Sequence, residues 1–230
     1  MRLDKYLTAA CDMTRKQARA AIRAGDVTVD DARVTAPGWH VATDSRIALS
    51  GQALASPAGR YFMLHKPEGY ICATRDGHRP TVLDLLDEPN RERLQIVGRL
   101  DRDTTGLLLL TDDGQWNHQV TSPRRDCGKV YLLETATPID PGAIEVFERG
   151  IVLQPENCRT RPARLVILAP QRAQLTISEG RYHQVKRMMA AVGSEVIRLH
   201  RSAIGAIRLD DGLAPGRYRP LTATEIESVG

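Results

Sequence analysis

Cysteine and tryptophan are scarce in this sequence, and their scarcity argues against several classes of site. Its 230 residues include 4 cysteines and 2 tryptophans. No two cysteines stand at the C-x-x-C spacing of a zinc site, and their scattered positions do not suggest a disulfide framework. We therefore predict free, buried thiols and no metal site. Trp39 and Trp116 are too few and too far apart in the chain to form a stacking platform for single-stranded nucleic acid.

Long apolar runs are also missing. Runs such as Leu107–Leu110 are far shorter than the roughly 20 residues that a membrane-spanning helix needs. The first residues, Met1–Tyr6, carry charged side chains, and no apolar stretch with a small-residue cleavage site follows them, so a secretory signal is not expected. These two absences predict a soluble, cytoplasmic protein that does not associate with a membrane.

The charge balance is mildly basic. Lysine and arginine number 32 against 28 acidic residues, which gives a net charge of +4 and a pI of about 9.0. This excess permits nucleic-acid binding without demonstrating it. Several basic residues after position 60 stand in clusters, which suit an anionic polymer better than a small neutral ligand. The clusters include Arg159, Arg161 and Arg164; Arg181, Lys186 and Arg187; and Arg198 and Arg201.

The N-terminal segment has the pattern of two short helices followed by strands at 27–29 and 46–49. Leu3, Tyr6 and Leu7 form an i, i+3, i+4 apolar stripe. Thr14 is a suitable N-cap for a second helix that runs to about Ala24 and ends at a glycine. The pattern therefore predicts a small, helix-rich domain.

The second helix has one basic face. Arg15, Arg19 and Arg23 stand at successive i+4 steps, with Lys16 beside them and no acidic residue among them. Like charges at this spacing repel, and phosphate groups of a partner would relieve that repulsion. The face can equally be a solvated helix surface, because charged surface stripes are common.

The stretch from Ala53 to Gly59 is small, uncharged and contains proline and glycine, which is typical of a linker. We predict a small first domain at 1–56, a linker at 57–60 and a larger second domain at 61–230. Strands are expected at 61–64, 107–110, 130–133, 165–168, 173–177, 196–199 and 206–209, and helices at 81–86, 141–149 and 181–192. Strands and helices do not alternate one by one, so the pattern predicts an α+β domain with a mixed, mainly antiparallel sheet.

The densest polar segment is the loop from Gly98 to Gly106, which contains Arg99, Asp101, Arg102 and Asp103 between two hydrophobic segments. A carboxylate on a loop held by rigid strands is a candidate nucleophile. It can equally cap a structural turn. The phosphate-binding pattern G-x-x-x-x-G-K-[ST] is absent, and the carboxylates do not have the spacing of a compact metal cage. A glycosidase-like pair of carboxylates stays possible.

Four segments in order along the chain resemble the motifs of the pseudouridine synthase family. They are His65-Lys66-Pro67-x-Gly69-Tyr70, the loop Gly98-Arg99-Leu100-Asp101-x-Asp103-Thr104-Thr105-Gly106, Lys129-Val130-Tyr131, and Glu179-Gly180-Arg181-Tyr182-His183-Gln184-Val185-Lys186. The basic helix followed by Gly25-Asp26-Val27-x-Val29-Asp30 resembles the S4-like RNA-binding domain that one branch of this family carries. The motif around Tyr182 is most similar to members that act on small-subunit (16S) ribosomal RNA.

The resemblance implies roles for individual residues. Asp101 is the expected nucleophile, Lys186 the cation that keeps it ionised, and Tyr131 the side chain that stacks on the uracil or exchanges a proton at C5. Many relatives have arginine at the position of Lys186. The lysine here is a departure, because its point charge lacks the bidentate geometry of an arginine. The RNA contacts are expected from Arg15, Lys16, Arg19, Arg23, Arg99, Arg102, Arg181 and Arg187. The four histidines at 65, 118, 183 and 200 lack metal-ligand spacing and are expected in ordinary polar roles.

Isomerising a uridine consumes no electrons, phosphate or donor group, so the resemblance implies no cofactor. The expected partner is 16S ribosomal RNA or an assembling small ribosomal subunit, and the expected protein is a monomer. Three alternatives stay open at this point: a synthase that acts on large-subunit rRNA, a synthase with another RNA target, and a non-catalytic RNA-binding assembly factor. It also stays open whether Asp101 attacks the sugar, attacks the base or abstracts a sugar proton.

Overall fold

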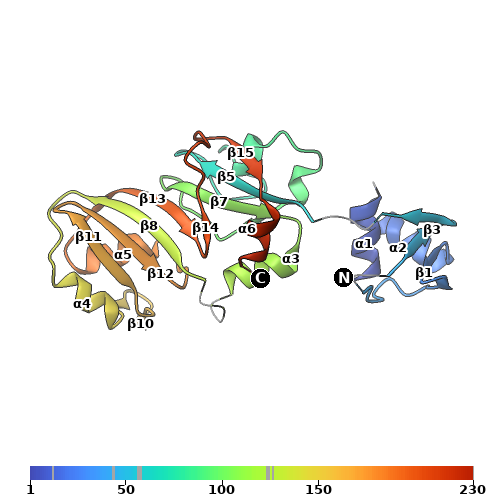
Figure 1. Cartoon of the computed structure of the whole chain (residues 1–230), viewed down its shortest axis with the longest axis horizontal. Coiled ribbons are helices and arrows are strands. Elements are labelled where there is room, and N and C mark those ends of the chain that lie inside the picture. Colours follow the sequence, from blue (N-terminus) through green and yellow to red (C-terminus); the bar gives the residue numbers. More distant parts are fainter. Residues whose placement is uncertain (12, 43–44, 56–58, 123–124, 126, 230) are drawn as a thin grey trace. The chain divides into compact units, whose positions relative to one another are not determined.

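The computed structural model describes residues 1–11, 13–42, 45–55, 59–122, 125 and 127–229. The chain forms two compact units, Met1–Ala58 and Gly59–Gly230, which we describe separately (Figure 1). The predicted linker at 57–60 lies partly outside the described residues, so its boundaries stay a prediction. The expectation that the linker-like stretch begins at Ala53 is wrong, because strand β4 (Gln52–Leu54) includes that residue and pairs with the preceding strand.

The N-terminal unit begins with two helices, α1 (Leu3–Ala10) and α2 (Arg15–Ala24). The Thr14 side chain caps α2 and forms a capping box with Gln17. Gly25 ends the helix with φ +79°, a left-handed conformation that glycine adopts without steric cost. The predicted start and stop signals of this helix are therefore confirmed.

A small antiparallel sheet completes this unit. Its strands β1 (Val27–Val29), β2 (Ala32–Arg33), β3 (Ile47–Leu49) and β4 lie in the order β2-β1-β3-β4. Leu3 and Leu7 from α1 and Ile22 from α2 pack in one core with Val27 and Ile47 from the sheet. The apolar stripe that the sequence predicts on the first helix is thus the face that this helix buries.

The C-terminal unit is built on a nine-stranded sheet. Seven of its strands lie in the order β11-β12-β8-β13-β7-β5-β15, and the other two, β14 and β6, pair with β13 and β7. Strand β13 pairs with β7 in parallel, and the other pairs are antiparallel. This arrangement confirms the predicted α+β class with a mainly antiparallel sheet. The strands are β5 (Tyr61–Lys66), β6 (Gln95–Val97), β7 (Thr105–Thr111), β8 (Lys129–Thr135), β11 (Arg164–Ala169), β12 (Arg172–Ile177), β13 (Val196–Ile204), β14 (Ile207–Arg208) and β15 (Tyr218–Pro220).

Shorter elements surround this sheet. They are η1 (Val82–Leu85), η2 (Arg91–Arg93), α3 (Gly114–Thr121), α4 (Ala143–Glu148), the β9–β10 hairpin (Val152–Leu153 and Cys158–Arg159), α5 (Gln184–Ala191) and α6 (Ala223–Glu227). The helix predicted from Arg181 begins three residues later, because His183 has φ +47° and cannot continue a helix. The helix predicted at 81–86 is a 3-10 turn. Helix α3 and strand β15 were not predicted.

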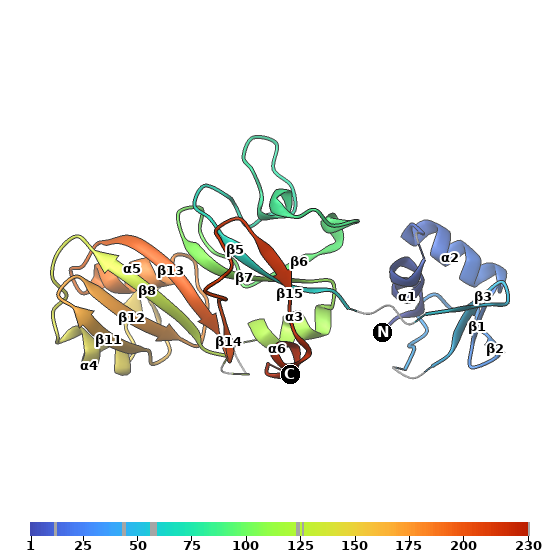
Figure 2. The same ribbon diagram turned by 45° about the horizontal axis from the view of Figure 1, so that its top comes forward.

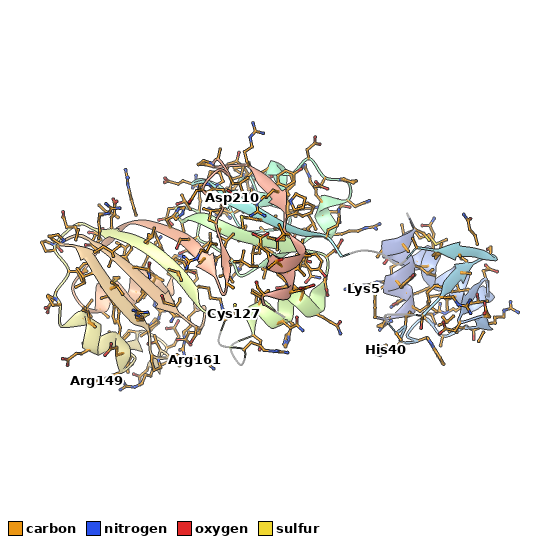
Figure 3. The ribbon with its side chains drawn as sticks, viewed as in Figure 1. Lys5, His40, Cys127, Arg149, Arg161 and Asp210 are labelled. Carbon is orange, nitrogen blue, oxygen red and sulfur yellow. The ribbon has the colours of Figure 1, made fainter. Side chains whose placement is uncertain are left out.

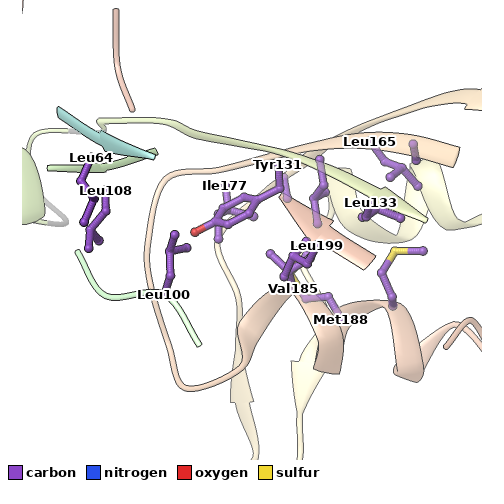
Figure 4. Packing of buried hydrophobic residues seen from close by; sticks show 14 of the residues in the cluster. Leu64, Leu100, Leu108, Tyr131, Leu133, Leu165, Ile177, Val185, Met188 and Leu199 are labelled. Atoms are coloured by element: carbon purple, nitrogen blue, oxygen red, sulfur yellow. The ribbon is translucent and has the colours of Figure 1, made fainter. Parts of the chain in front are cut away.

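The leucine run Leu107–Leu110 explains how the sheet separates two cores. Leu108 and Leu110 face the core that contains Tyr131 and the apolar side of α5 (Figure 4). Leu107 and Leu109 face the opposite core, which α3 and α6 cover (Figure 2). Side chains alternate between the two faces of a strand, so a strand buried on both faces is apolar throughout. The run is therefore a central strand whose polar neighbours lie only at its ends.

Gly106 permits a close approach between β7 and β13. Its φ is +107°, and a Cβ atom there would lie 2.3 Å from the main-chain oxygen of Arg201. We predict that Gly106→Ala lowers the free energy of unfolding of this unit by at least about 3 kcal/mol, because it adds both backbone strain and a clash with main-chain atoms. Urea unfolding measures this change. Gly77→Ala is the control, because no atom lies within 4 Å of the added methyl group; equal midpoints for the two variants would contradict the prediction.

Candidate active site

The loop from Gly98 to Gly106 joins β6 to β7, two strands that pair antiparallel. Gly98 has φ +71°, a left-handed conformation that turns the chain out of β6. The Thr104 amide donates to the Asp101 carbonyl at 3.2 Å, which closes a turn around residues 102 and 103. The Asp101 side chain is 28% exposed, so a substrate can reach its carboxylate.

Arg201 on β13 binds both ends of this loop. Its Nη2 donates to the Gly98 carbonyl at 2.8 Å, and its Nε donates to the Leu107 carbonyl at 2.8 Å. Arg201 is only 2% exposed. We interpreted Arg198 and Arg201 as a basic cluster that suits an anionic polymer. The burial of Arg201 contradicts that interpretation. No local pattern distinguishes this arginine from its exposed neighbour Arg198.

Tyr131 lies on β8 beside the loop and is buried. Its hydroxyl accepts a hydrogen bond from Nη1 of Arg201 at 3.4 Å, and the guanidinium carbon lies 5.9 Å from the ring centre. The hydroxyl end points toward Leu100, the residue that precedes Asp101 (Figure 4). The structure thus brings Tyr131 to the loop, while its action on the uracil stays a prediction.

Lys66, the last residue of β5, supports the loop from a second side. It is fully buried, and its ammonium group donates to the carbonyls of Pro67, Arg102 and Thr104 at 3.0, 3.2 and 2.8 Å. Burial, the largest effect, lowers the pKa of Lys66 below its usual value. The nearby Cys72, Asp103 and Asp101 oppose this shift. Sequence reasoning quoted this lysine within a motif and gave it no role, because its acceptors are main-chain atoms.

Lys186 on α5 reaches both carboxylates of the loop, but not equally. Its Nζ lies 2.6 and 2.7 Å from the two oxygens of Asp103 and 3.9 Å from Oδ2 of Asp101. The hydrogen bond from Lys186 holds the pKa of Asp103 below its usual value. The predicted cation is therefore near Asp101, although its hydrogen bonds go to Asp103.

His183 is a site residue that sequence reasoning missed. Its Nε2 lies 3.4 Å from Oδ1 of Asp101, and its ring stacks on Tyr182 with centroids 3.8 Å apart and an interplanar angle of 19°. The available signal was its place within the motif that runs from Glu179 to Lys186. The left-handed conformation of His183 places its side chain off the helix, so helical periodicity could not locate it.

The arginines predicted to bind RNA in this unit fall into two pairs. Arg99 and Arg102 are exposed on the loop that carries Asp101. Arg181 pairs with Glu179 at 3.2 Å and donates to the Arg159 carbonyl at 2.9 Å. Arg187 pairs with Glu156 and donates to the Tyr182 carbonyl. Arg181 and Arg187 therefore hold the segment around Tyr182 in place, and the contacts of all four with RNA stay predictions.

The basic helix face is present in the N-terminal unit. Arg15, Lys16 and Arg23 are exposed. Arg19 instead donates to Asp4 at 3.0 Å, a buried carboxylate that also binds Arg2. The two arginines lower the pKa of Asp4, while burial, the largest effect, opposes them. The ion pair between Arg19 and Asp4 thus joins α2 to α1.

Three further observations concern groups outside the loop. Among the described residues, no three histidine, cysteine or acidic side chains lie close enough together to hold a metal ion. Within the same residues, no helix is long and apolar enough to cross a lipid bilayer. The four cysteines are free, but none is fully buried and Cys158 is exposed, so the prediction of buried thiols is wrong. Side chains of both units, among them Lys5 and Arg149, are drawn in Figure 3.

The loop, its two buried cations and the helix that carries Lys186 form one candidate site in the unit from Gly59 to Gly230. Residues 60–191 match the family of RNA pseudouridylate synthases, and residues 1–47 match the S4 domain. The first match covers more than half of the chain. The chain therefore belongs to the pseudouridine synthase family and carries an S4 domain, which confirms the resemblance of its motifs.

Relatives cover the whole chain. It is 51% identical over 231 residues to the ribosomal small subunit pseudouridine synthase A of Yersinia pestis, covering 100% of this chain and 98% of that protein. It is 50% identical over 230 residues to the protein of the same name from Escherichia coli K12, with full coverage of both. A crystal structure of a pseudouridylate synthase superimposes with a TM-score of 0.73 at 44% identity, again covering both chains fully.

We expect Arg201→Lys to lower the free energy of unfolding by about 2 kcal/mol or more. An ammonium group cannot satisfy the carbonyls of Gly98 and Leu107 and also reach Tyr131, so buried acceptors lose their partner. Chemical denaturation measures the change. Arg198→Lys, at an 81% exposed side chain of the same strand, should stay within about 0.5 kcal/mol of the parent. If both variants unfold alike, Arg201 does not hold the loop.

Proposed function

We propose that this pseudouridine synthase converts a uridine of small-subunit ribosomal RNA to pseudouridine, with Asp101 as the nucleophile. The observation that carries the proposal is the partly exposed carboxylate of Asp101. It lies beside Lys186 and His183, on a loop bound at both ends by Arg201. The choice of RNA is supported by full-length relatives that are named for the small ribosomal subunit and are 50–51% identical in sequence to this chain.

The reaction breaks the N1–C1′ bond, turns the uracil and joins C5 to C1′, and the net change moves one proton from C5 to N1. No electron or group donor takes part, so the chain needs no cofactor. Asp101 supplies the nucleophile. Lys186 is the proposed cationic partner of Asp101, because its Nζ lies 3.9 Å from Oδ2 of that residue. Tyr131 is the proposed group that stacks on the uracil or exchanges the C5 proton.

The target base leaves its stack to reach these groups, which costs a few kcal/mol that contacts with the RNA backbone can offset. We propose that Arg99 and Arg102 supply such contacts beside the loop, and Arg15, Lys16, Arg19 and Arg23 in the S4 domain. We propose that the protein acts as a monomer. The proposed setting is the cytoplasm, on 16S rRNA or an assembling small subunit.

Asp101→Asn is expected to lower pseudouridine formation at least about a thousand-fold, because the amide is not a nucleophile of comparable strength. The assay incubates the protein with a small-subunit rRNA fragment, without metal or nucleotide, and maps pseudouridine by carbodiimide-blocked primer extension. RNA affinity should persist in the variant.

Asp103→Asn is the matched control, because it removes a carboxylate two residues away that also faces Lys186. We expect it to retain at least about a tenth of the parent turnover. If Asp101→Asn kept more than a few per cent of the activity, or if the Asp103 variant lost as much, the nucleophile assignment would be wrong. A parent protein that modifies no uridine under several RNA folding conditions would refute the proposed reaction.

The basic face of α2 can be tested through the salt dependence of binding. Arg15→Gln and Arg23→Gln should each reduce the slope of log Kd against log salt concentration by about 0.7–0.9, the value for one lost phosphate contact. Fluorescence anisotropy with the same RNA fragment measures the slope. Arg46→Gln serves as the control, because Arg46 is an exposed arginine of the same unit that already pairs with Asp31. Unchanged slopes would place the phosphate contacts elsewhere.

A further inference from the structure

Tyr182 is exposed beside the candidate nucleophile. It is 70% exposed, whereas the other five tyrosines are buried or only partly exposed. An exposed tyrosine ring beside a site offers an apolar face to a partner. One face of the ring lies on His183, which also lies 3.4 Å from Asp101.

We propose that the outer face of Tyr182 is a stacking platform for a nucleobase next to the target uridine. Tyr182 then helps to determine which uridine is converted to pseudouridine. This inference rests on the proposed function. Every base has a π-face, and a tyrosine ring is large enough to cover one. Tyr182 and His183 already form a parallel stack, which a base would extend by one ring.

Hydrogen bonds hold the backbone of the segment that carries Tyr182. Gln184 is buried, accepts from the Arg181 amide at 2.9 Å and donates to Glu179 at 3.0 Å. Arg187 donates to the carbonyl of Tyr182 itself at 3.1 Å. A segment held in this way loses little conformational entropy when a base stacks on it, so more of the stacking energy contributes to binding.

The sequence of contacts indicates which base is recognised. His183, not Tyr182, meets the carboxylate of Asp101, at 3.4 Å. In the stack of the two rings, His183 therefore faces Asp101, and Tyr182 lies on the far side of His183. The target nucleotide must meet Asp101, so the base on Tyr182 belongs to a neighbour of the target. The left-handed conformation of His183, which costs a non-glycine residue some strain, sets this order.

The test combines protein and RNA variants. The parent protein and Tyr182→Ala are each measured on three small-subunit rRNA fragments: the intact RNA, and RNAs with an abasic site on the 5′ or the 3′ side of the target. On intact RNA, Tyr182→Ala should raise Kd and KM about 5- to 150-fold, the range reported for loss of one stacked base, with a smaller change in kcat. At one of the two abasic positions the parent should lose a similar factor, and Tyr182→Ala should lose little more.

Two further variants separate stacking from structural support. Tyr182→Phe keeps the ring and should stay within about twofold of the parent. Val146→Ala shortens an exposed apolar side chain on α4, outside the site, and should have no effect. The proposal is overturned if Tyr182→Ala behaves like Val146→Ala, or if its loss is the same on all three RNAs, which would mean that the ring only supports His183. A parent protein that modifies no uridine refutes the proposed reaction instead, and the Kd values still decide whether Tyr182 stacks.

Discussion

The geometry of the site depends on the buried guanidinium of Arg201. A charged group out of water is costly unless its donors are satisfied, and Arg201 finds its acceptors in the carbonyls of Gly98 and Leu107. These carbonyls stand at the two ends of the loop that carries Asp101, so one side chain sets the separation of the ends. The parallel contact of β13 with β7, which Gly106 permits, brings Arg201 within reach.

The cations around the loop have different tasks. Lys66 binds only main-chain carbonyls and so shapes the turn from inside. Lys186 gives its short hydrogen bonds to Asp103 and approaches Asp101 at 3.9 Å. A carboxylate that makes short hydrogen bonds with both oxygens is less available as a nucleophile. Asp103 therefore anchors the cation, which leaves Asp101 as the better candidate for the proposed nucleophile.

Local structure was predicted well where its cause is local. The cap at Thr14, the left-handed end at Gly25 and the apolar stripe of α1 depend on residues within one or two turns, and all are confirmed. Helix α3 was missed because its apolar residues, among them Trp116, are few and mixed with polar ones. The start of α5 was misplaced because nothing in the local pattern reveals the left-handed conformation of His183.

The sequence by itself determined the family, through four motifs in order, and it indicated Asp101, Tyr131 and Lys186 as members of one site. Only the tertiary structure decided how they meet. The bond between Lys186 and Asp103 spans 83 residues, and that between Arg201 and Gly98 spans 103. Such contacts follow from strand order and from the parallel pairing of β13 with β7, which side-chain periodicity along one element does not encode. The buried role of Arg201 and the place of His183 beside Asp101 are consequences of that packing.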